Sequence, residues 1–331
     1  MKAVIPVAGA GTRLRPHTYT QPKTLIPVAG KPIIGIIIDQ LKAVGVDDFV
    51  FIIGHLGEKI RDYITNSYPD LNCEFVHQYE RLGIGHAIWS AREELKDADE
   101  IMIILGDSII DGDFKALLED PHSMIMIKKV STPGTFGVVE TDDQGIITNI
   151  VEKPKIPKSN LAVVGVYKIK EVEKLINAIQ YNIDHELKTL DEYQLTDAIM
   201  AIINDGVRIG TMRVDNWFDC GKKEILLNTN RMLLEKATYP TDDFPAYFNS
   251  IIIHPVSIGT NCDIQNSVIG PHVTISDNVV IHSAIIKNSI IGDYAKIEDI
   301  VLDDSIVGND AAVKGFNQSL NIGDNTEIDF S

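Results

Sequence analysis

Short apolar runs alternate with amphipathic segments over the first part of this 331-residue chain. The apolar runs predict strands at residues 2–7, 49–53, 73–78 and 100–105. The segments between them predict helices at residues 32–44, 56–66 and 84–95. This alternation is typical of βαβ units, in which helices cover both faces of a parallel sheet. The predicted fold class is α/β, with a Rossmann-like mixed, mainly parallel sheet.

The region between residues 123 and 170 is richer in strand-forming residues. Strands are expected at residues 136–139 and 161–167, in the runs Phe136-Gly137-Val138-Val139 and Leu161 to Tyr167. Helices near residues 171–181, 194–205 and 222–236 would then close the first domain.

The apolar period changes after residue 250. Apolar residues now recur five or six positions apart, at Ile258, Ile264, Ile269, Ile275, Ile281, Ile286, Ile291, Ile297, Leu302, Val307 and Val313. No helix has this period, and the paired Asn-Gly turn signals of antiparallel hairpins are missing. A hexapeptide repeat winds a parallel β-helix, and we expect the left-handed form with three to four coils.

These patterns predict a domain of residues 1–236, a linker at 237–250 and a β-helix at 251–331. The stacked coils of a β-helix present flat sides and an open end that need covering, so we expect a homo-oligomer.

Composition excludes several classes of protein. A formal net charge of -17 argues against a general nucleic-acid or anionic-membrane binder. No stretch approaches the ~20 apolar residues of a membrane span, and no signal-peptide pattern precedes the first strand, so we expect a cytoplasmic protein without membrane partners. The three cysteines are far apart and odd in number, which favours neither disulfides nor a zinc site.

A glycine-rich loop with nearby cations follows the first strand. It runs from Ala8 through Gly9 and Gly11 to Thr12 and Arg13. Backbone N–H groups in such a loop bind anions, and Arg13, with Lys23 and Lys31 further on, would add positive charge. The third glycine of the dinucleotide fingerprint is replaced by Leu14, and the Gly-Lys-Ser/Thr of a Walker A loop is absent. The loop therefore predicts a different kind of polyphosphate site.

The loop and the segments after it resemble a known signature. Residues 9–16 read G-x-G-T-R-L-x-P, residues 22–28 read P-K-x-L-x-P-V, and residues 31–32 read K-P. In order and spacing they are similar to the sugar-1-phosphate nucleotidylyltransferases, above all to the thymidylyltransferases and uridylyltransferases that act on glucose 1-phosphate. The resemblance covers roughly residues 1–235, and many members also carry a C-terminal repeat region.

Two aspartates are candidate metal ligands. Asp107 stands after the apolar run 101–105 and Gly106, where a carboxylate is suited to hold Mg²⁺, although a turn or helix cap would also explain it. Asp219 lies in the segment Trp217-Phe218-Asp219-Cys220-Gly221 and could likewise be a helix cap. The resemblance implies that both bind one Mg²⁺, since the segment is similar to W-x-D-T-G, with Cys220 in place of the threonine.

The resemblance also implies binding and catalytic residues. The expected nucleotide-binding residues are Ala8, Gly9, Gly11, Thr12, Arg13, Gln78 and Gly83, with Gln78 at the edge of a pyrimidine. The expected sugar-phosphate-binding residues are Gly137, Glu152, Lys153 and Gly165. The expected catalytic residues are Arg13, Lys23, Asp107, Lys153 and Asp219. His86 has no paired nucleophile and is expected on a helix face without a catalytic role.

These parts imply a direct reaction. The phosphate of a sugar 1-phosphate, with glucose 1-phosphate the nearest resemblance, would attack the α-phosphorus of dTTP or UTP and release pyrophosphate. Catalysis would then consist of positioning and charge stabilisation. The alternatives are a guanylyltransferase for mannose 1-phosphate, a bifunctional uridylyltransferase and acyltransferase, and a non-catalytic regulatory homologue. The last would be expected to have lost a charged site residue, and none is missing.

Overall fold

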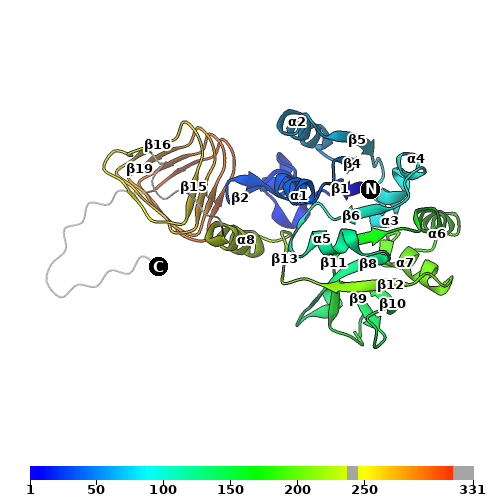
Figure 1. Ribbon diagram of the computed structural model, residues 1–331. Coiled ribbons are helices and arrows are strands. Elements are labelled where there is room, and N and C mark those ends of the chain that lie inside the picture. Colours follow the sequence, from blue (N-terminus) through cyan, green and yellow to red (C-terminus); the bar gives the residue numbers. More distant parts are fainter. Residues whose placement is uncertain (237–244, 316–331) are drawn as a thin grey trace. The chain divides into compact units, whose positions relative to one another are not determined.

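The computed structural model describes residues 1–236 and 245–315, which divide into two compact units (Figure 1). The first unit comprises residues 1–26 and 31–226, and the second comprises residues 27–30 and the chain from residue 227 onward. The division falls within helix α8 (Lys223–Lys236). Residues 237–244 of the predicted linker and 316–331 of the predicted β-helix lie outside the described residues.

A nine-stranded mixed sheet organises the first unit. One half is parallel, in the order β6 (Ile101–Ile104), β1 (Lys2–Pro6), β4 (Asp48–Ile53) and β5 (Asn72–His77). The other half is mostly antiparallel and consists of β8 (Ser123–Lys129), β9 (Gly137–Thr141), β10 (Ile147–Glu152), β11 (Leu161–Ile169) and β12 (Ile209–Arg213). Strand β11 joins the halves by pairing antiparallel with β6. The mixed α/β sheet that the apolar pattern predicts is therefore confirmed.

Helices cover both faces of this sheet. They are α1 (Ile33–Lys42), α2 (Gly57–Ser67), α3 (Ile84–Ser90), α4 (Arg92–Leu95), α5 (Phe114–Glu119), α6 (Val172–Asp184) and α7 (Leu195–Asn204). Val4 and Val50 pack in one core cluster with residues of α3, α6 and α7. Ile5 and Phe51 point to the opposite face because side chains alternate along a strand, and they are fully buried as well. The predicted helix 84–95 is divided into α3 and α4 at Ala91.

The second unit contains three parallel four-stranded sheets whose strands stack coil upon coil (Figure 1). The first sheet consists of β14 (Ile251–Ile252), β17 (Val268–Ile269), β20 (Ile285–Ile286) and β23 (Val301–Leu302). The second consists of β15 (Val256–Ile258), β18 (Val273–Ile275), β21 (Ile290–Ile291) and β24 (Ile306–Val307). The third consists of β16 (Asp263–Gln265), β19 (Val280–His282), β22 (Lys296–Glu298) and β25 (Ala312–Lys314). The expected parallel β-helix is confirmed, and its handedness stays a prediction.

Each coil returns to the same sheet after slightly less than three hexapeptides. Ile251 pairs with Val268, 17 positions later, and Ile285 pairs with Val301, 16 positions later. The apolar positions of the repeat stack inside, where Ile281 is fully buried. The second half of α8 belongs to the same unit: the Asn230 side-chain oxygen accepts hydrogen bonds from the Thr274 hydroxyl at 2.6 Å and the Ala29 N–H at 2.8 Å.

Candidate active site

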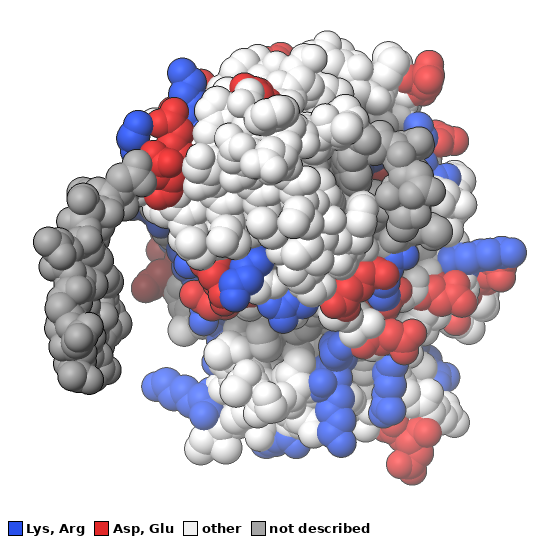
Figure 2. All heavy atoms as spheres, turned by 90° about the vertical axis from the view of Figure 1, so that its left-hand side faces the viewer, with Lys and Arg blue, Asp and Glu red and all other residues white. Residues whose placement is uncertain are grey.

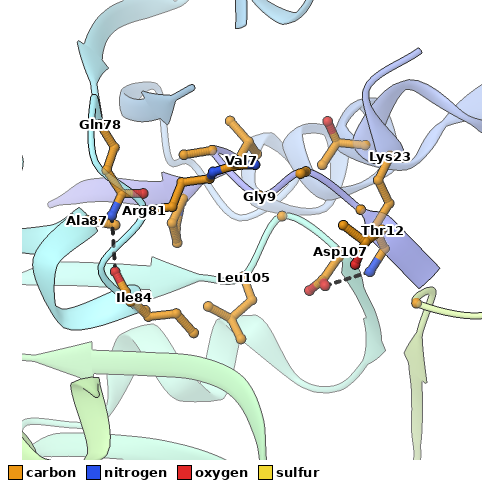
Figure 3. Close-up of a pocket in the computed structure, with 18 of the residues that line it drawn as sticks. Val7, Gly9, Thr12, Lys23, Gln78, Arg81, Ile84, Ala87, Leu105 and Asp107 are labelled. Atoms are coloured by element: carbon orange, nitrogen blue, oxygen red, sulfur yellow. Dashed lines mark hydrogen bonds and ion pairs between the residues drawn. The ribbon is translucent and has the colours of Figure 1, made fainter. Parts of the chain in front are cut away.

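A pocket of about 460 Å³ opens in the first unit at the carboxyl ends of β1 and β6 (Figure 3). The glycine loop after β1 and the Leu105–Asp107 turn after β6 both line it. They meet because β1 and β6 are parallel neighbours, with Lys2 opposite Ile101. Figure 3 shows Gln78 and Arg81 at one end of the pocket and Thr12, Lys23 and Asp107 at the other.

The glycine loop contributes backbone to the pocket wall. Gly11 has a φ of 59° and precedes the short 3₁₀ helix η1 (Thr12–Leu14). Its carbonyl accepts a hydrogen bond from the Thr18 hydroxyl at 2.8 Å, and a Cβ at this position would lie 2.9 Å from a Thr18 methyl group. Glycine is therefore required here both for the left-handed conformation and for space. All five predicted loop residues, Ala8, Gly9, Gly11, Thr12 and Arg13, line the pocket.

The charged end of the pocket is organised around Lys23. Its side chain is largely buried, and its Nζ lies 2.6 Å from an Asp107 oxygen and 3.8 Å from an Asp219 oxygen. The Arg13 guanidinium stands 4.0 Å from Asp219. Burial raises the pKa of Asp219, and the negative charge of Asp107 adds to the shift, while Lys23 and Arg13 act in the opposite direction. Two carboxylates and two cations thus share one site.

Antiparallel pairing brings the two aspartates together. Strand β7 (Ser108–Asp111) pairs with β13 (Asn216–Asp219), with Ser108 opposite Asp219, and the Cys220 N–H donates to the Asp107 carbonyl at 3.0 Å. Asp219 itself is not among the residues that line the pocket, but Gly221 is. A Cβ at Gly221 would lie 2.6 Å from an Arg13 nitrogen, so this glycine admits the guanidinium.

The opposite end of the pocket is built on Gln78 and Gly83. Gln78 follows β5, and only 7% of it is exposed. Its Nε2 donates to the Gly83 carbonyl at 3.1 Å and lies 3.2 Å from the His86 Nδ1. Gly83 has a φ of 110°, and a Cβ there would lie 2.6 Å from the Tyr193 carbonyl oxygen. His86 lies on α3, as expected, and burial lowers its pKa.

The predicted sugar-phosphate residues lie outside this pocket's lining, and three of them, Gly137, Glu152 and Lys153, adjoin one another. The Glu152 carboxylate accepts a hydrogen bond from the Thr196 hydroxyl at 3.2 Å, and Lys153 Nζ lies 3.5 Å from its other oxygen. A Cβ at Gly137 would stand 3.1 Å from the same carboxylate. Gly165, with a φ of 89°, accepts a hydrogen bond from the N–H of Leu105, which does line the pocket.

The sequence patterns also misjudged or missed several residues. Lys31, expected to add positive charge to the anion site, does not line the pocket and forms an ion pair with Asp39 instead. Arg81 and Glu192 line the pocket but belong to no motif, and Glu192 comes from a distant turn. Only the position of Arg81 between Gln78 and Gly83 could have indicated that it lies here.

Comparisons with known proteins agree with the fold and the motifs. A protein-family model described as nucleotidyl transferase matches residues 2–236. A glucose-1-phosphate thymidylyltransferase of Streptomyces antibioticus is 32% identical over 88% of this chain and 86% of that protein. A low-salt glycan biosynthesis nucleotidyltransferase of Haloferax volcanii is 34% identical over 71% of this chain and 66% of that protein.

Two further matches each cover 71% of this chain. The bifunctional protein GlmU of Methanocaldococcus jannaschii is 37% identical over 71% of this chain, which spans only 55% of that protein. A solved UDP-glucose pyrophosphorylase in complex with UDP-glucose superposes with a TM-score of 0.62 at 24% identity, covering 71% of this chain and 99% of that one, and so supports the fold. Since the family model spans well over half of the sequence, the chain belongs to the nucleotidyl transferase family of enzymes.

Proposed function

We propose that this enzyme transfers a nucleotidyl group from dTTP or UTP to glucose 1-phosphate and releases pyrophosphate. The observation that carries the proposal is the contact of Lys23 with Asp107 and Asp219 beside a glycine loop in a 460 Å³ pocket. This arrangement offers backbone N–H groups, fixed cations and paired carboxylates to a triphosphate. The names of the relatives from Streptomyces antibioticus and Haloferax volcanii support the choice of reaction.

The reaction needs no protein nucleophile. An oxygen of the sugar phosphate forms a bond to the α-phosphorus, and the bond from the α-phosphorus to the oxygen that bridges to the β-phosphorus breaks. The electron pair leaves with pyrophosphate. Arg13 and Lys23 stabilise the charge on the triphosphate and the leaving group by fixed positive charge, which is the main form of catalysis open to phosphoryl chemistry.

The two aspartates fit a Mg²⁺ ion. No cluster of three or more His, Cys, Asp or Glu side chains within residues 1–236 and 245–315 is arranged to hold a metal. Mg²⁺ often takes only one or two carboxylates and completes its shell with phosphate oxygens and water, so Asp107 and Asp219 suffice. The raised pKa of Asp219 reflects in part its repulsion by Asp107, which a cation would relieve. When bound, Mg²⁺ would neutralise charge on the phosphates.

Glu152 and Lys153 would bind the acceptor. The Glu152 carboxylate would accept hydrogen bonds from sugar hydroxyls, and Lys153 would align the attacking phosphate. Gly137 and Gly165 carry no side chain and would offer backbone groups to the sugar.

Pyrophosphate release over a panel of nucleoside triphosphates and sugar 1-phosphates, with Mg²⁺, tests the proposal. We expect turnover with glucose 1-phosphate and either dTTP or UTP, since one methyl group is worth only about 1–3 kcal/mol in a pocket. Turnover restricted to GTP and mannose 1-phosphate would replace the substrate assignment. A full-length protein that releases no pyrophosphate with any pair would refute the reaction.

We also propose that the enzyme is a cytoplasmic homo-oligomer. The oligomer is inferred from an exposed row of apolar side chains on the β-helix. Ile251, Ile285 and Val301 are 61%, 47% and 63% exposed and lie in register on the first sheet of the β-helix, with Val268 between them. Figure 2 shows a broad area of uncharged residues, polar and apolar alike, on the face of the β-helix toward the viewer. An exposed row of apolar side chains such as Ile251, Ile285 and Val301 marks a protein contact. No helix within the described residues has the length and apolar character to cross a membrane.

A further inference from the structure

Gln78 and His86 contact each other at the end of the pocket opposite Lys23 and Asp107. The proposed reaction makes no use of this contact. Gln78 is fixed at the end of β5, where its N–H donates to the Ile53 carbonyl at 2.9 Å. His86 lies on α3, packs against Trp89 with ring centroids 5.8 Å apart, and faces Gln78 with its Nδ1. The two side chains therefore come from different elements and are each held in place.

The Gly83 carbonyl and His86 Nδ1 together set which way the Gln78 amide points. The Gly83 carbonyl can only accept a hydrogen bond, so the group 3.1 Å away from it must be the Gln78 NH₂. The second N–H of that group is directed at His86 Nδ1, 3.2 Å away. Nδ1 can accept it only when the imidazole is neutral and carries its proton on Nε2. Burial lowers the pKa of His86 and so favours the neutral form, although Glu80 partly opposes the shift.

The amide then presents one kind of group to a ligand. Both N–H bonds of Nε2 are directed at protein acceptors, and in Figure 3 the oxygen of Gln78 lies on the other arm of the amide, away from its dashed hydrogen bond. An oxygen can only accept a hydrogen bond from a ligand. Uracil, thymine and guanine carry an N–H donor on the ring at their pairing edge, whereas cytosine and adenine carry a lone pair there.

We propose that His86 is a positioning residue that locks the amide of Gln78, so that the pocket selects a nucleobase with a ring N–H donor and rejects cytosine. The inference rests on the proposed function in one respect only, namely that the base occupies the Gln78 end of the pocket. Together with the Gly83 carbonyl, His86 would hold the amide in the orientation that discriminates UTP from CTP. A site committed to one hydrogen-bonding pattern rejects a ligand that lacks it strongly.

Equilibrium binding of UTP and of CTP to the full-length protein, by titration calorimetry with Mg²⁺, tests the inference. Wild type is expected to bind UTP at least about tenfold more tightly than CTP. His86→Leu keeps the bulk but loses the acceptor, and should lower the UTP-to-CTP affinity ratio about five- to tenfold. His86→Asn returns an acceptor oxygen close to the position of Nδ1 and should restore most of the ratio.

Several outcomes would overturn the inference. One is a wild-type protein that binds UTP and CTP equally. Others are a UTP-to-CTP affinity ratio that does not change in His86→Leu, or an equal loss of affinity for both nucleotides in that variant. The last is a His86→Asn variant that has the same ratio as His86→Leu. His86→Asn keeps the test decisive if His86→Leu does not fold. Pyrophosphate release with glucose 1-phosphate, measured on the same samples, separates the two proposals: discrimination without turnover refutes only the reaction, and turnover with an unchanged ratio refutes only the role of His86.

Discussion

Lys23 links the two carboxylates at the charged end of the pocket. Its Nζ lies within 2.6 Å of Asp107 and 3.8 Å of Asp219, and the side chain has little freedom because only 8% of the residue is exposed. A buried cation between two carboxylates stabilises charge on a bound triphosphate. Its removal would also leave the two carboxylates without their counter-charge, so both the rate and the stability are expected to fall.

Lys23→Ala is expected to lower kcat/KM about 10²- to 10³-fold, the usual cost of removing one fixed charge from a phosphoryl-transfer site. Pyrophosphate release measures the change, and a circular dichroism melt checks the fold. Lys31→Ala is the matched control, because Lys31 pairs with Asp39 outside the pocket. A half-exposed pair of this kind contributes little, so the control should stay within about twofold of wild type. Equal losses in both variants would contradict a specific role for Lys23.

Asp219→Asn should separate activity from stability. The pKa of Asp219 is raised, chiefly by burial and then by Asp107, so the folded protein holds this proton more tightly than the unfolded chain does. The contribution of Asp219 to stability is therefore greatest below the usual carboxylate pKa and is lost as pH rises through the raised value. The variant should be inactive yet have a higher Tm than wild type at neutral pH, and the difference should shrink in acid. A lower Tm at neutral pH would show that the pairing with Lys23 and Arg13 outweighs burial.

At the scale of elements, tight turns between strands and helices shape the pocket. The turn from β5 to α3 passes through Gly83 and lies against the segment that ends at Gln194. The Gly85 N–H donates to the Tyr193 carbonyl at 2.8 Å, and the Tyr193 N–H donates to Leu82 at the same distance. These two backbone hydrogen bonds join the two segments at the Gln78 end of the pocket.

Gly83→Ala should disturb that junction. The added Cβ would meet the Tyr193 carbonyl at 2.6 Å in a residue with a φ of 110°, so the backbone must shift. We expect a loss of about 1–3 kcal/mol in the free energy of unfolding, measured in urea. A rise in the KM for UTP of about tenfold should accompany it, the equivalent of one or two hydrogen bonds.

Gly45→Ala is the control for strain alone. Gly45 has a φ of 84°, but no atom lies within 4 Å of its would-be Cβ. It should lose about 1 kcal/mol of stability with an unchanged KM. The same KM in both variants would mean that the Gly83 turn does not shape the nucleotide site.

At the scale of the whole molecule, the chain combines a compact α/β unit with a stacked β-helix. Helix α8 begins in the first unit and continues into the second, where Asn230 is tied to the β-helix through Thr274. All the predicted site residues lie in the first unit. The second unit is therefore free to serve assembly.

The proposed homo-oligomer predicts that Ile285→Lys lowers the molar mass in solution. Ile285 is central in the exposed apolar row between Val268 and Val301, and a buried unpaired lysine in an interface would oppose association. Size-exclusion chromatography with light scattering measures the mass. Lys314→Ala, at an exposed charged position on another sheet of the β-helix, is the control. A monomeric wild type would refute the oligomer itself, and an oligomer unaffected by Ile285→Lys would refute this surface.

Local patterns in the sequence predicted much of the fold because the spacing of apolar residues reflects which side chains of a strand or coil face the core. The run Ala3-Val4-Ile5 gives a buried strand, and a recurrence of Ile every five or six residues matches the inward positions of a β-helix coil. The pairing of strands that lie far apart in the sequence could not be predicted from these patterns. The antiparallel joining of β11 to β6 depends on which of several apolar strands pack together, and periodicity carries no such information.

The same division holds for the site. The order and spacing of residues along the chain were enough to identify a glycine loop, a set of fixed charges and the family to which they belong. The packing of the folded chain places Asp219 beside Asp107 through β7 and β13, pairs Lys31 with Asp39, and brings His86 Nδ1 to 3.2 Å from the Gln78 amide nitrogen. Local spacing follows from backbone geometry within a few residues. Contacts between residues far apart in the chain are set by the packing of whole elements, which minimises exposed apolar surface across the entire unit.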